Sequence, residues 1–489
     1  MKKMLAVLLA VFLLAGCAGP AEETTHPTET TVPETTLPET EPSTQESEPS
    51  LFADYEYRHT DERDRNWEED IVYLTKTLLG ENVTKGHPYL QDKDFTIYTL
   101  RGMDQVVSSG NFYDATLRDE FIAAMDQLID AIPDLTDTQI VFEMQANLAM
   151  LKDLHTSVYQ SLEYEGSLII PVFYEVLCNE NGPELYVTQL PEKYEECLLG
   201  RLMSINGVDV PTILNDIGAY ISVENEYAAV WAAASWFSTS LISYPEMLAQ
   251  IGVMELTDST VELTFELEDG TVTTIQAPVL TIEEAYASVK RVYGDLYRRG
   301  AYIYTNYLTD NYWYDVLEED HLLYIRFNRF DKEEDCTYRE FVRQIDEVLR
   351  NAEGITKVAV DVRINGGGWG IYADTLIDAI ENAGIEQVYV LIDSGSYSAS
   401  INLATYLRVN MECARIVGTP GGQPANFWGG VQGFYLPNSG LYFQRPSTFC
   451  NNIPGDENDA LMPDIIIYQT IEDYRDGIDT VLEAVKNFE

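Results

Sequence analysis

Residues 355–400, ITKVAVDVRINGGGWGIYADTLIDAIENAGIEQVYVLIDSGSYSAS, decide the fold. Residues 355–362 are a continuous apolar run of strand length, a glycine-rich turn follows, and residues 371–383 have the apolar spacing of an amphipathic helix. The order then repeats, with residues 387–393 as a strand and residues 398–411 as a helix. Two such units in succession predict a βαβ crossover and therefore a parallel sheet.

The turns that follow the two strands are the first candidate for a functional site. They read Asn-Gly-Gly-Gly at 365–368 and Ser-Tyr-Ser-Ala-Ser at 396–400, and both fall at the carboxyl edge of the expected sheet, where ligands bind. The glycine turn fits a plain tight turn, a phosphate cradle or a source of oxyanion donors. Ser398 is most simply a helix N-cap, but a hydroxyl at this position is also well placed to attack a carbonyl.

A serine nucleophile needs a base, and the chain has five histidines. His26 lies in a low-complexity stretch, and His59, His87 and His321 are expected at the surface because their surroundings are polar or loop-like. His155 differs, since it follows a predicted amphipathic helix and precedes a strand-like run. It is either a capping or core histidine or the base of a catalytic site.

Four segments, in this order, resemble the carboxy-terminal processing, or tail-specific, serine peptidases, and among them the tricorn-like branch. Asp-Leu-His-Thr at 153–156 is similar to the element that supplies the histidine of that branch, and 361–368 is similar to its Asp-x-Arg-x-Asn-x-Gly-Gly turn. Residues 396–400 match the nucleophile segment, and 418–425 with 436–440 resemble the region after the nucleophile in extracytoplasmic members from Gram-positive bacteria. The resemblance covers nearly the whole chain after Leu51.

The resemblance implies a catalytic triad. It aligns Ser398 with the nucleophile, His155 with the base and Glu457 with the carboxylate, with Asp456 and Asp459 as competitors for the third place. The Ser-Lys type of the family is disfavoured, because no lysine occurs between Lys357 and Lys486 and a glutamine, Gln423, stands near the position of the family lysine.

The oxyanion donors implied by the resemblance are the N–H of Ala399 and one from the glycine turn, Gly367 or Gly368. Two features depart from the family. Leu154 replaces the usual glycine before the histidine, and 200–210 resembles only the last part of a peptide-binding PDZ domain. We therefore expect a reduced PDZ-like module rather than a full one.

The expected fold class is α/β, with a ClpP/crotonase-like parallel-sheet core. Helices are predicted at 66–79, 117–132 and 138–151, and a hairpin at 260–267 and 271–276. We expect five parts along the chain: a lipoprotein signal peptide and lipobox (1–17), a disordered Thr/Glu/Pro-rich tether (18–50), an N-terminal helical domain carrying His155 (51–165), a β-rich PDZ-like or insert region (166–300), and the serine peptidase core (301–489).

The N-terminus predicts export and lipid anchoring. Two lysines precede a short apolar run that ends in Leu-Ala-Gly-Cys, the order that lipoprotein signal peptidases recognise, so Cys17 is the expected lipidation site. An ordinary secretory signal is the alternative, and it changes the anchor but not the compartment. The expected location is the outer face of the cell membrane, with the extended acidic tether holding the domain clear of it.

The charge balance excludes some partners. The chain has 81 acidic and 30 basic residues, a net charge of −51, which argues against nucleic acid and against direct adsorption to anionic lipid. Five cysteines beyond Cys17 have no CxxC spacing, which argues against a zinc site. We expect no metal and no cofactor. Cys178 and Cys197 either form a disulfide or remain free thiols.

The function expected from these residues is hydrolysis of peptides or unfolded protein segments through an acyl-enzyme at Ser398. The alternatives are a catalytically inactive member of the family that binds peptides or envelope components, and a solute-binding lipoprotein. The latter explains the anchor but not the serine, histidine and glycine segments.

Overall fold

The computed structural model describes residues 52, 55–100, 105–108, 112–159, 167–235, 240–291, 310–331, 336–351, 354–368 and 373–488. Cys17 and the acidic tether, for which the sequence predicts lipidation and disorder, lie outside the described residues. Within the described residues, no helix is long and apolar enough to cross a membrane. The five cysteines between Cys178 and Cys450 are all free thiols.

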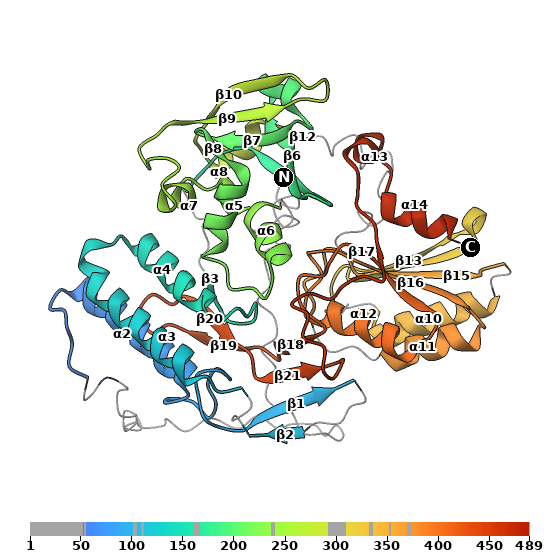
Figure 1. Cartoon of the computed structure of the whole chain (residues 1–489), viewed down its shortest axis with the longest axis horizontal. Coiled ribbons are helices and arrows are strands. Elements are labelled where there is room, and N and C mark those ends of the chain that lie inside the picture. The colour runs from blue at the N-terminus through green and yellow to red at the C-terminus, as the bar shows by residue number, and fades with distance from the viewer. Residues whose placement is uncertain are drawn as a thin grey trace, which may run out of the picture.

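The centre of the C-terminal part is a six-stranded sheet (Figure 1). Four of its neighbouring pairs are parallel, and only the first strand runs antiparallel to its neighbour. The strands predicted at 355–362 and 387–393 are confirmed as its two central strands, which lie side by side. In spatial order the strands are β13 (Tyr312–Leu317), β14 (Leu322–Phe327), β15 (Lys357–Asp361), β16 (Gln387–Ile392), β17 (Ala414–Gly418) and β22 (Ile465–Ile466).

Helices cover both faces of this sheet. The helices α10 (Tyr338–Asn351), α11 (Ala373–Asn382) and α12 (Ala399–Asn410) pack on one face, where Val358 and Val360 belong to the same core as their apolar residues. Helix α14 (Thr480–Asn487) packs on the other face, against Ala359 and its neighbours. Because successive side chains of a strand point to opposite faces, continuous apolar strands such as 357–361 are what a sheet covered on both faces requires.

A second sheet with its own core lies above the first in Figure 1. The predicted hairpin is confirmed as β9 and β10, joined by a turn at Gly270. The aromatic and alanine-rich stretch 226–250 is helical only at its two ends: α6 ends at Ala234, and α7 begins at Pro245, whose ring cannot continue a preceding helix. The elements are β5 (Phe173–Asn179), β6 (Gly182–Pro191), β7 (Arg201–Ile205), β8 (Val208–Asp209), α5 (Val210–Gly218), α6 (Glu226–Ala234), α7 (Pro245–Gln250), β9 (Thr260–Glu266), β10 (Val272–Pro278) and β12 (Val289–Arg291), with the small pair β4 (Leu168–Ile169) and β11 (Leu280–Thr281) before α8 (Ile282–Ser288).

The three helices predicted in the N-terminal part are confirmed as α2 (Glu62–Leu79), α3 (Ala115–Ala131) and α4 (Asp137–Ala149). Thr136 caps α4 through a reciprocal pair of hydrogen bonds with Gln139. This part is not purely helical, however, because it supplies strands to two small sheets made with the C-terminal part. These sheets contain β1 (Phe95–Thr99), β2 (Gln105–Val107), β18 (Asn426–Gly429) and β21 (Thr448–Asn451), and β3 (Ser157–Tyr159), β19 (Gln432–Tyr435) and β20 (Tyr442–Arg445).

The pairing of these strands places the N-terminal part beside the α/β core. Strand β1 lies parallel to β21, and β3 lies antiparallel to β20. Residues separated by about 300 positions in the sequence are thereby held at fixed register. Since His155 lies just before β3, this pairing decides where its side chain comes to rest.

Candidate active site

Ser398 lies on a strained turn between β16 and α12. Its backbone has φ 52° and ψ −115°, a conformation that costs energy for a residue with a side chain and that marks strand-to-helix turns presenting a nucleophile. The Ser398 N–H donates to Oε1 of Gln423 at 2.7 Å, and its side chain does not cap the helix. Ser398 instead lines an open cleft, and its side chain is not the N-cap of α12.

His155 and Ser398 are in hydrogen-bond contact. Nε2 of His155 lies 3.2 Å from Oγ of Ser398, although the two residues are 243 positions apart. The imidazole is buried and stacks on Phe427, with ring centroids 5.9 Å apart and an interplanar angle of 12°. Burial lowers the pKa of His155, so that its neutral form, the form able to accept a proton, is favoured. The pair has the geometry of a nucleophile and its base.

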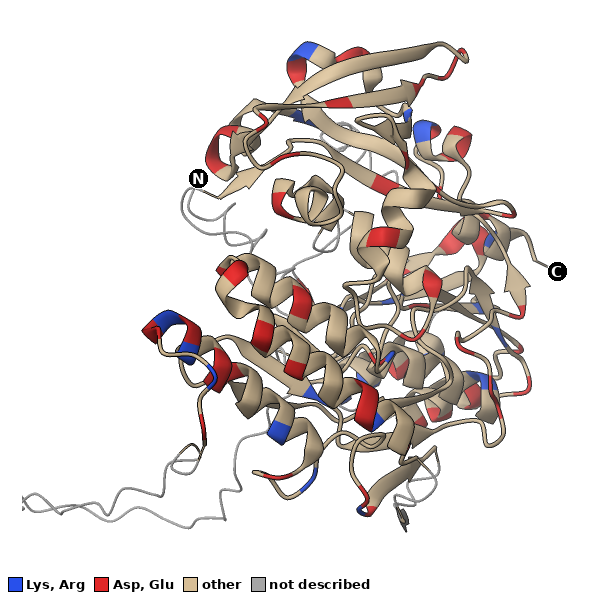
Figure 2. Ribbon diagram, turned by 60° about the vertical axis from the view of Figure 1, so that its left-hand side comes forward, with Lys and Arg blue, Asp and Glu red and all other residues tan. Residues whose placement is uncertain are grey.

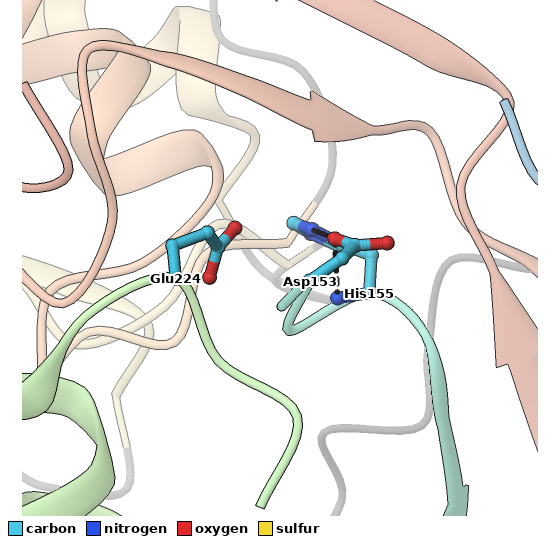
Figure 3. A group of neighbouring side chains, drawn as sticks. All are labelled: Asp153, His155 and Glu224. Carbon is cyan, nitrogen blue, oxygen red and sulfur yellow. Dashed lines mark hydrogen bonds and ion pairs between the residues drawn. The ribbon is translucent and has the colours of Figure 1, made fainter. Parts of the chain in front are cut away.

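Two carboxylates lie on the other side of the imidazole. Asp153 and Glu224 each have an oxygen that lies within 4.8 Å of the other and of a ring nitrogen of His155. Figure 3 shows Glu224 reaching in from the segment before α6, while Asp153 and His155 come from the turn before β3. Asp153 Oδ1 is 3.9 Å from Nδ1 and is the charge that favours the imidazolium form of His155.

Glutamine 423 joins Glu224 to the serine and the histidine. Its Nε2 donates to Oε1 of Glu224 at 2.5 Å and lies 3.4 Å from Nδ1 of His155, while its Oε1 accepts from Ser398. The Ser398 N–H can only donate, so this contact fixes which way the amide points. Burial, followed by the negative charge of Asp153, raises the pKa of Glu224 to about 8. Glu224 is therefore mostly protonated at neutral pH.

The same three residues are a conceivable metal-ligand set, but their oxygens already have partners. Asp153 Oδ1 accepts from the His155 N–H at 3.0 Å, and Oδ2 accepts from the Thr156 hydroxyl at 2.5 Å. Glu224 accepts from Gln423 and from the N–H of Leu154. The arrangement is that of a hydrogen-bonded acidic support for a histidine rather than of a set of ligands open to a cation.

Glu457, the carboxylate expected from the sequence, lies elsewhere. Its side chain is exposed, and no hydrogen bond or ion pair joins it to His155 among the described residues. The competitor Asp459 is exposed too, and its backbone carbonyl accepts from Asn225 Nδ2 at 2.9 Å. The structure thus brings Ser398 and His155 together but gives the imidazole Asp153 and Glu224 as neighbours in place of Glu457.

His87 was expected at the surface, and this expectation is wrong. The side chain is fully buried, and its Nε2 lies 3.5 Å from Oδ2 of Asp153. Burial lowers the pKa of His87, which favours the neutral imidazole. His87 comes from a loop whose burial depends on the packing of β20, so no local sequence signal identified it.

The three expected oxyanion donors are not equivalent. Gly368 and Ala399 line the same cleft as Ser398. The N–H of Gly367 instead donates to Oδ1 of Asn365 at 2.8 Å, within its own turn. Gly367 has a different role: a side chain there would put Cβ only 2.6 Å from Cβ of Ser398, and φ is +94°. Glycine at this position lets the turn pack directly against Ser398.

A buried ion network holds the glycine turn in place. Arg363 donates to both oxygens of Asp361 and of Asp479, at 2.6 to 3.1 Å, and Arg326 pairs with Asp361 at 3.0 Å. Asn365 donates to the carbonyl of Phe327 and accepts, through its own carbonyl, from the Ser400 hydroxyl. The Asp-x-Arg-x-Asn part of the motif therefore acts structurally, by fixing the turn relative to the serine.

An open cleft of about 1080 Å³ leads to the serine. Besides Ser398, Gly368 and Ala399, it is lined by the edge of β18 at Gly429 and by Gln432 of β19. Both of these strands are at the end of their sheets, so each has one edge that is not paired within the described part of the chain. An extended chain seated here has backbone donors and acceptors to pair with.

The sequence matches no family model and no curated protein. Among solved structures, a serine-to-alanine mutant of CPAF superposes with a TM-score of 0.54 and 12% identity, over 87% of this chain and 98% of that chain. Mature CPAF complexed with lactacystin gives a TM-score of 0.51 and 13% identity, over 86% and 97%. The photosystem II D1 C-terminal processing protease covers 87% and 97% at 13% identity, but its TM-score is only 0.36. The chain therefore shares the fold of CPAF over most of its length.

Proposed function

We propose that the protein is a serine endopeptidase that cleaves peptides or unfolded protein segments, related to the tricorn-like branch of the carboxy-terminal processing peptidases. The observation that carries the proposal is the 3.2 Å contact between Nε2 of His155 and Oγ of Ser398, with the serine on a strained turn at the start of α12. A structural serine and a core histidine have no need of this contact. The order of the motifs along the chain supports the same assignment.

In the first half of the reaction, Oγ of Ser398 attacks the carbonyl carbon of the scissile bond while its proton passes to Nε2 of His155. The oxyanion that forms is stabilised by the N–H groups of Ala399 and Gly368. His155 then gives the proton to the leaving amine as the C–N bond breaks, which leaves an acyl group on Ser398. Water, activated by the same imidazole, hydrolyses this ester and restores the serine.

We assign the acidic support of His155 to Asp153 and Glu224 in place of Glu457. Accepting the serine proton at Nε2 requires that Nδ1 carry the ring proton toward Asp153 Oδ1, at 3.9 Å, and in this tautomer the NH2 group of Gln423, 3.4 Å from the same nitrogen, donates to Glu224 and not to the ring. Glu224 acts through Gln423, which touches both the serine backbone and the imidazole.

Activity is tested with a fluorophosphonate probe, which labels serine nucleophiles that have a working base. The wild-type protein is expected to be labelled, and Ser398→Ala and His155→Ala are expected to lose labelling while keeping their circular dichroism spectra. A wild-type protein that stays unlabelled, under conditions that label a known serine peptidase, rejects the enzymatic proposal and favours the inactive, peptide-binding alternative.

We further propose that the enzyme is exported and anchored by lipid at Cys17, on the sequence of the lipobox alone. Peptide and protein substrates are then those present outside the cytoplasm. Metabolic labelling with a palmitate analogue is expected to mark the wild-type protein, and Cys17→Ala is expected to abolish the label and release the protein from the membrane fraction. Membrane association that persists without the label would contradict the anchor.

A further inference from the structure

The cleft beside Ser398 has the opposite charge from the rest of the chain. Acidic residues are 81 of 489, about one in six, and Figure 2 shows them recurring along the helices and loops. The described residues that line the cleft nevertheless include no aspartate or glutamate, and two of them are cationic, Lys85 and Arg445. A net charge of −51 makes such a site the exception on this molecule.

Arg445, the last residue of β20, is the more unusual of the two. Its side chain is almost completely buried, yet it forms no ion pair with any residue that the structure describes. Its hydrogen bonds both use Nη1 and go to backbone carbonyls, those of Gly86 at 3.1 Å and Pro446 at 3.2 Å. Its Nε is buried without a hydrogen-bond partner in the described part of the chain. Burial without a compensating carboxylate lowers the pKa of Arg445 to about 10.

Two other buried arginines have carboxylate partners, which Arg445 lacks among the described residues. Arg326 and Arg363 are also buried, and both are paired with Asp361, with Asp479 as a further partner of Arg363. A buried cation without a carboxylate partner keeps a desolvation penalty. The two carbonyl acceptors and the ring of Phe434 offset part of it, and an anion bound in the cleft would offset more.

Lys85 reinforces the charge of Arg445. It directly precedes Gly86, whose carbonyl accepts a hydrogen bond from Arg445, so the two cations lie on the same wall of the cleft. Lys85 is half-buried and makes no ion pair within the described residues. Phe434, which lies under the guanidinium at 5.5 Å, limits where that group can move.

We propose that Arg445 and Lys85 bind a carboxylate of the peptide that occupies the cleft, so that substrates with a suitably placed acidic group are preferred. This proposal rests on the proposed peptidase function, since it assigns a specificity to the same site. A guanidinium N–H donates a strong, charge-assisted hydrogen bond to a carboxylate. Nε of Arg445 is buried out of reach of a peptide in the cleft, whereas Nη2, which has no hydrogen bond to any residue that the structure describes, is the nitrogen available to donate. The carboxylate comes from an aspartate or glutamate side chain or from a free C-terminus, which share this chemistry.

The test uses short fluorescein-labelled peptides of neutral sequence in which one glutamate is moved through each position, with a matched set that carries glutamine. Each peptide is made with a free and with an amidated C-terminus. Binding to the full-length Ser398→Ala protein is measured by fluorescence polarisation, and kcat/KM is measured with the wild type. One placement of the carboxylate is expected to improve binding and kcat/KM by about tenfold or more, the size of a charge-assisted hydrogen bond.

In Arg445→Met, the ratio of kcat/KM for the glutamate peptide to kcat/KM for its glutamine counterpart is expected to fall close to one. In Lys85→Met the same ratio is expected to fall severalfold. Arg350→Met, which removes the same charge from an exposed pair on α10, is the matched control and is expected to keep the preference. If amidation of the peptide abolishes the preference, the carboxylate is that of the C-terminus. If exchange of glutamate for glutamine abolishes it, the carboxylate is that of a side chain. If Arg445→Met does not fold, Lys85→Met and the wild-type ratio still decide the question.

The proposal is overturned if glutamate and glutamine peptides, free and amidated, are bound equally, or if both cleft variants keep the full preference. Hydrolysis without any preference would refute this specificity and leave the peptidase function intact. A preference in binding without hydrolysis would refute the peptidase function and leave the carboxylate site intact.

Discussion

Replacing Glu224 with glutamine is expected to remove a specific step from the pH profile of the proposed peptidase. Burial and the charge of Asp153 raise the pKa of Glu224 to about 8, so the side chain is neutral below this pH and negative above it. The negative form lies close to the imidazole and stabilises the imidazolium that forms in the transition state. Wild-type kcat/KM is therefore expected to rise as the pH increases through about 8.

The size of the step is set by the distance between the two charges. At 4.8 Å, the largest separation within this group of atoms, and an effective dielectric constant of about 20, one unit charge changes the energy of the imidazolium by about 3.5 kcal/mol. Every 1.4 kcal/mol, roughly, is a factor of ten in rate, so the expected rise is on the order of a hundredfold to several hundredfold. Burial lowers the pKa of His155, which is already neutral at pH 7, and its own titration therefore does not produce a rise near pH 8.

The assay is kcat/KM from pH 5 to 10 on a peptide without ionisable side chains, for wild type, Glu224→Gln and the control Glu457→Gln. Glu224→Gln is expected to be flat near pH 8, and Glu457→Gln is expected to follow the wild type. A step that persists in Glu224→Gln refutes the assignment. A profile that changes only in Glu457→Gln would restore that residue as the acidic member of the triad.

The same shift has a consequence for stability, with a definite sign. A carboxyl whose pKa is raised on folding stabilises the protein fully below its unfolded pKa of about 4.3, and this contribution is lost as the pH rises through about 8. Urea denaturation at pH 5 and pH 9 should therefore show a larger loss in the free energy of unfolding for the wild type than for Glu224→Gln. Equal losses would mean that the folded-state pKa is not raised.

Two further variants test the support of the nucleophile. Gly367→Ala is expected to lower kcat/KM by at least about a hundredfold with the fold retained, because the added Cβ would lie 2.6 Å from Cβ of Ser398 and a displacement of about one ångström costs this much. The control is Gly384→Ala, which is also at positive φ but has no atom within 4 Å of the added Cβ. Equal kcat/KM values for the two variants would contradict the argument. Arg363→Met is expected to lower the free energy of unfolding by about 3 to 5 kcal/mol, since it leaves Asp361 and Asp479 buried without their shared cation, whereas the exposed Arg350→Met should cost less than about 1 kcal/mol by urea denaturation.

The sequence alone determined the parts of the protein that local patterns encode. The apolar runs at 357–361 and 387–392 are buried on both faces of the sheet, and such runs identify central parallel strands without any knowledge of their neighbours. The spacing of apolar residues likewise predicted α2, α3 and α4. Ser398 was accessible to prediction because it sits at the junction of two such elements.

Only the tertiary structure decided what surrounds the imidazole. Glu224 lies 69 positions from His155 in a segment without helical or strand periodicity, and it reaches the site through the packing of the β-rich part on the core. The burial of His87 and the position of Arg445 also depend on contacts between distant segments, since Arg445 donates to the carbonyl of Gly86, directly before His87, and His87 lies beside Asp153. A periodic pattern reports the face that a residue turns inward, but it carries no information about which distant segment fills the space opposite. For that reason the sequence could single out Ser398 and His155, and only the fold showed that they lie in contact, with Glu224 beside them and a cationic wall on the cleft.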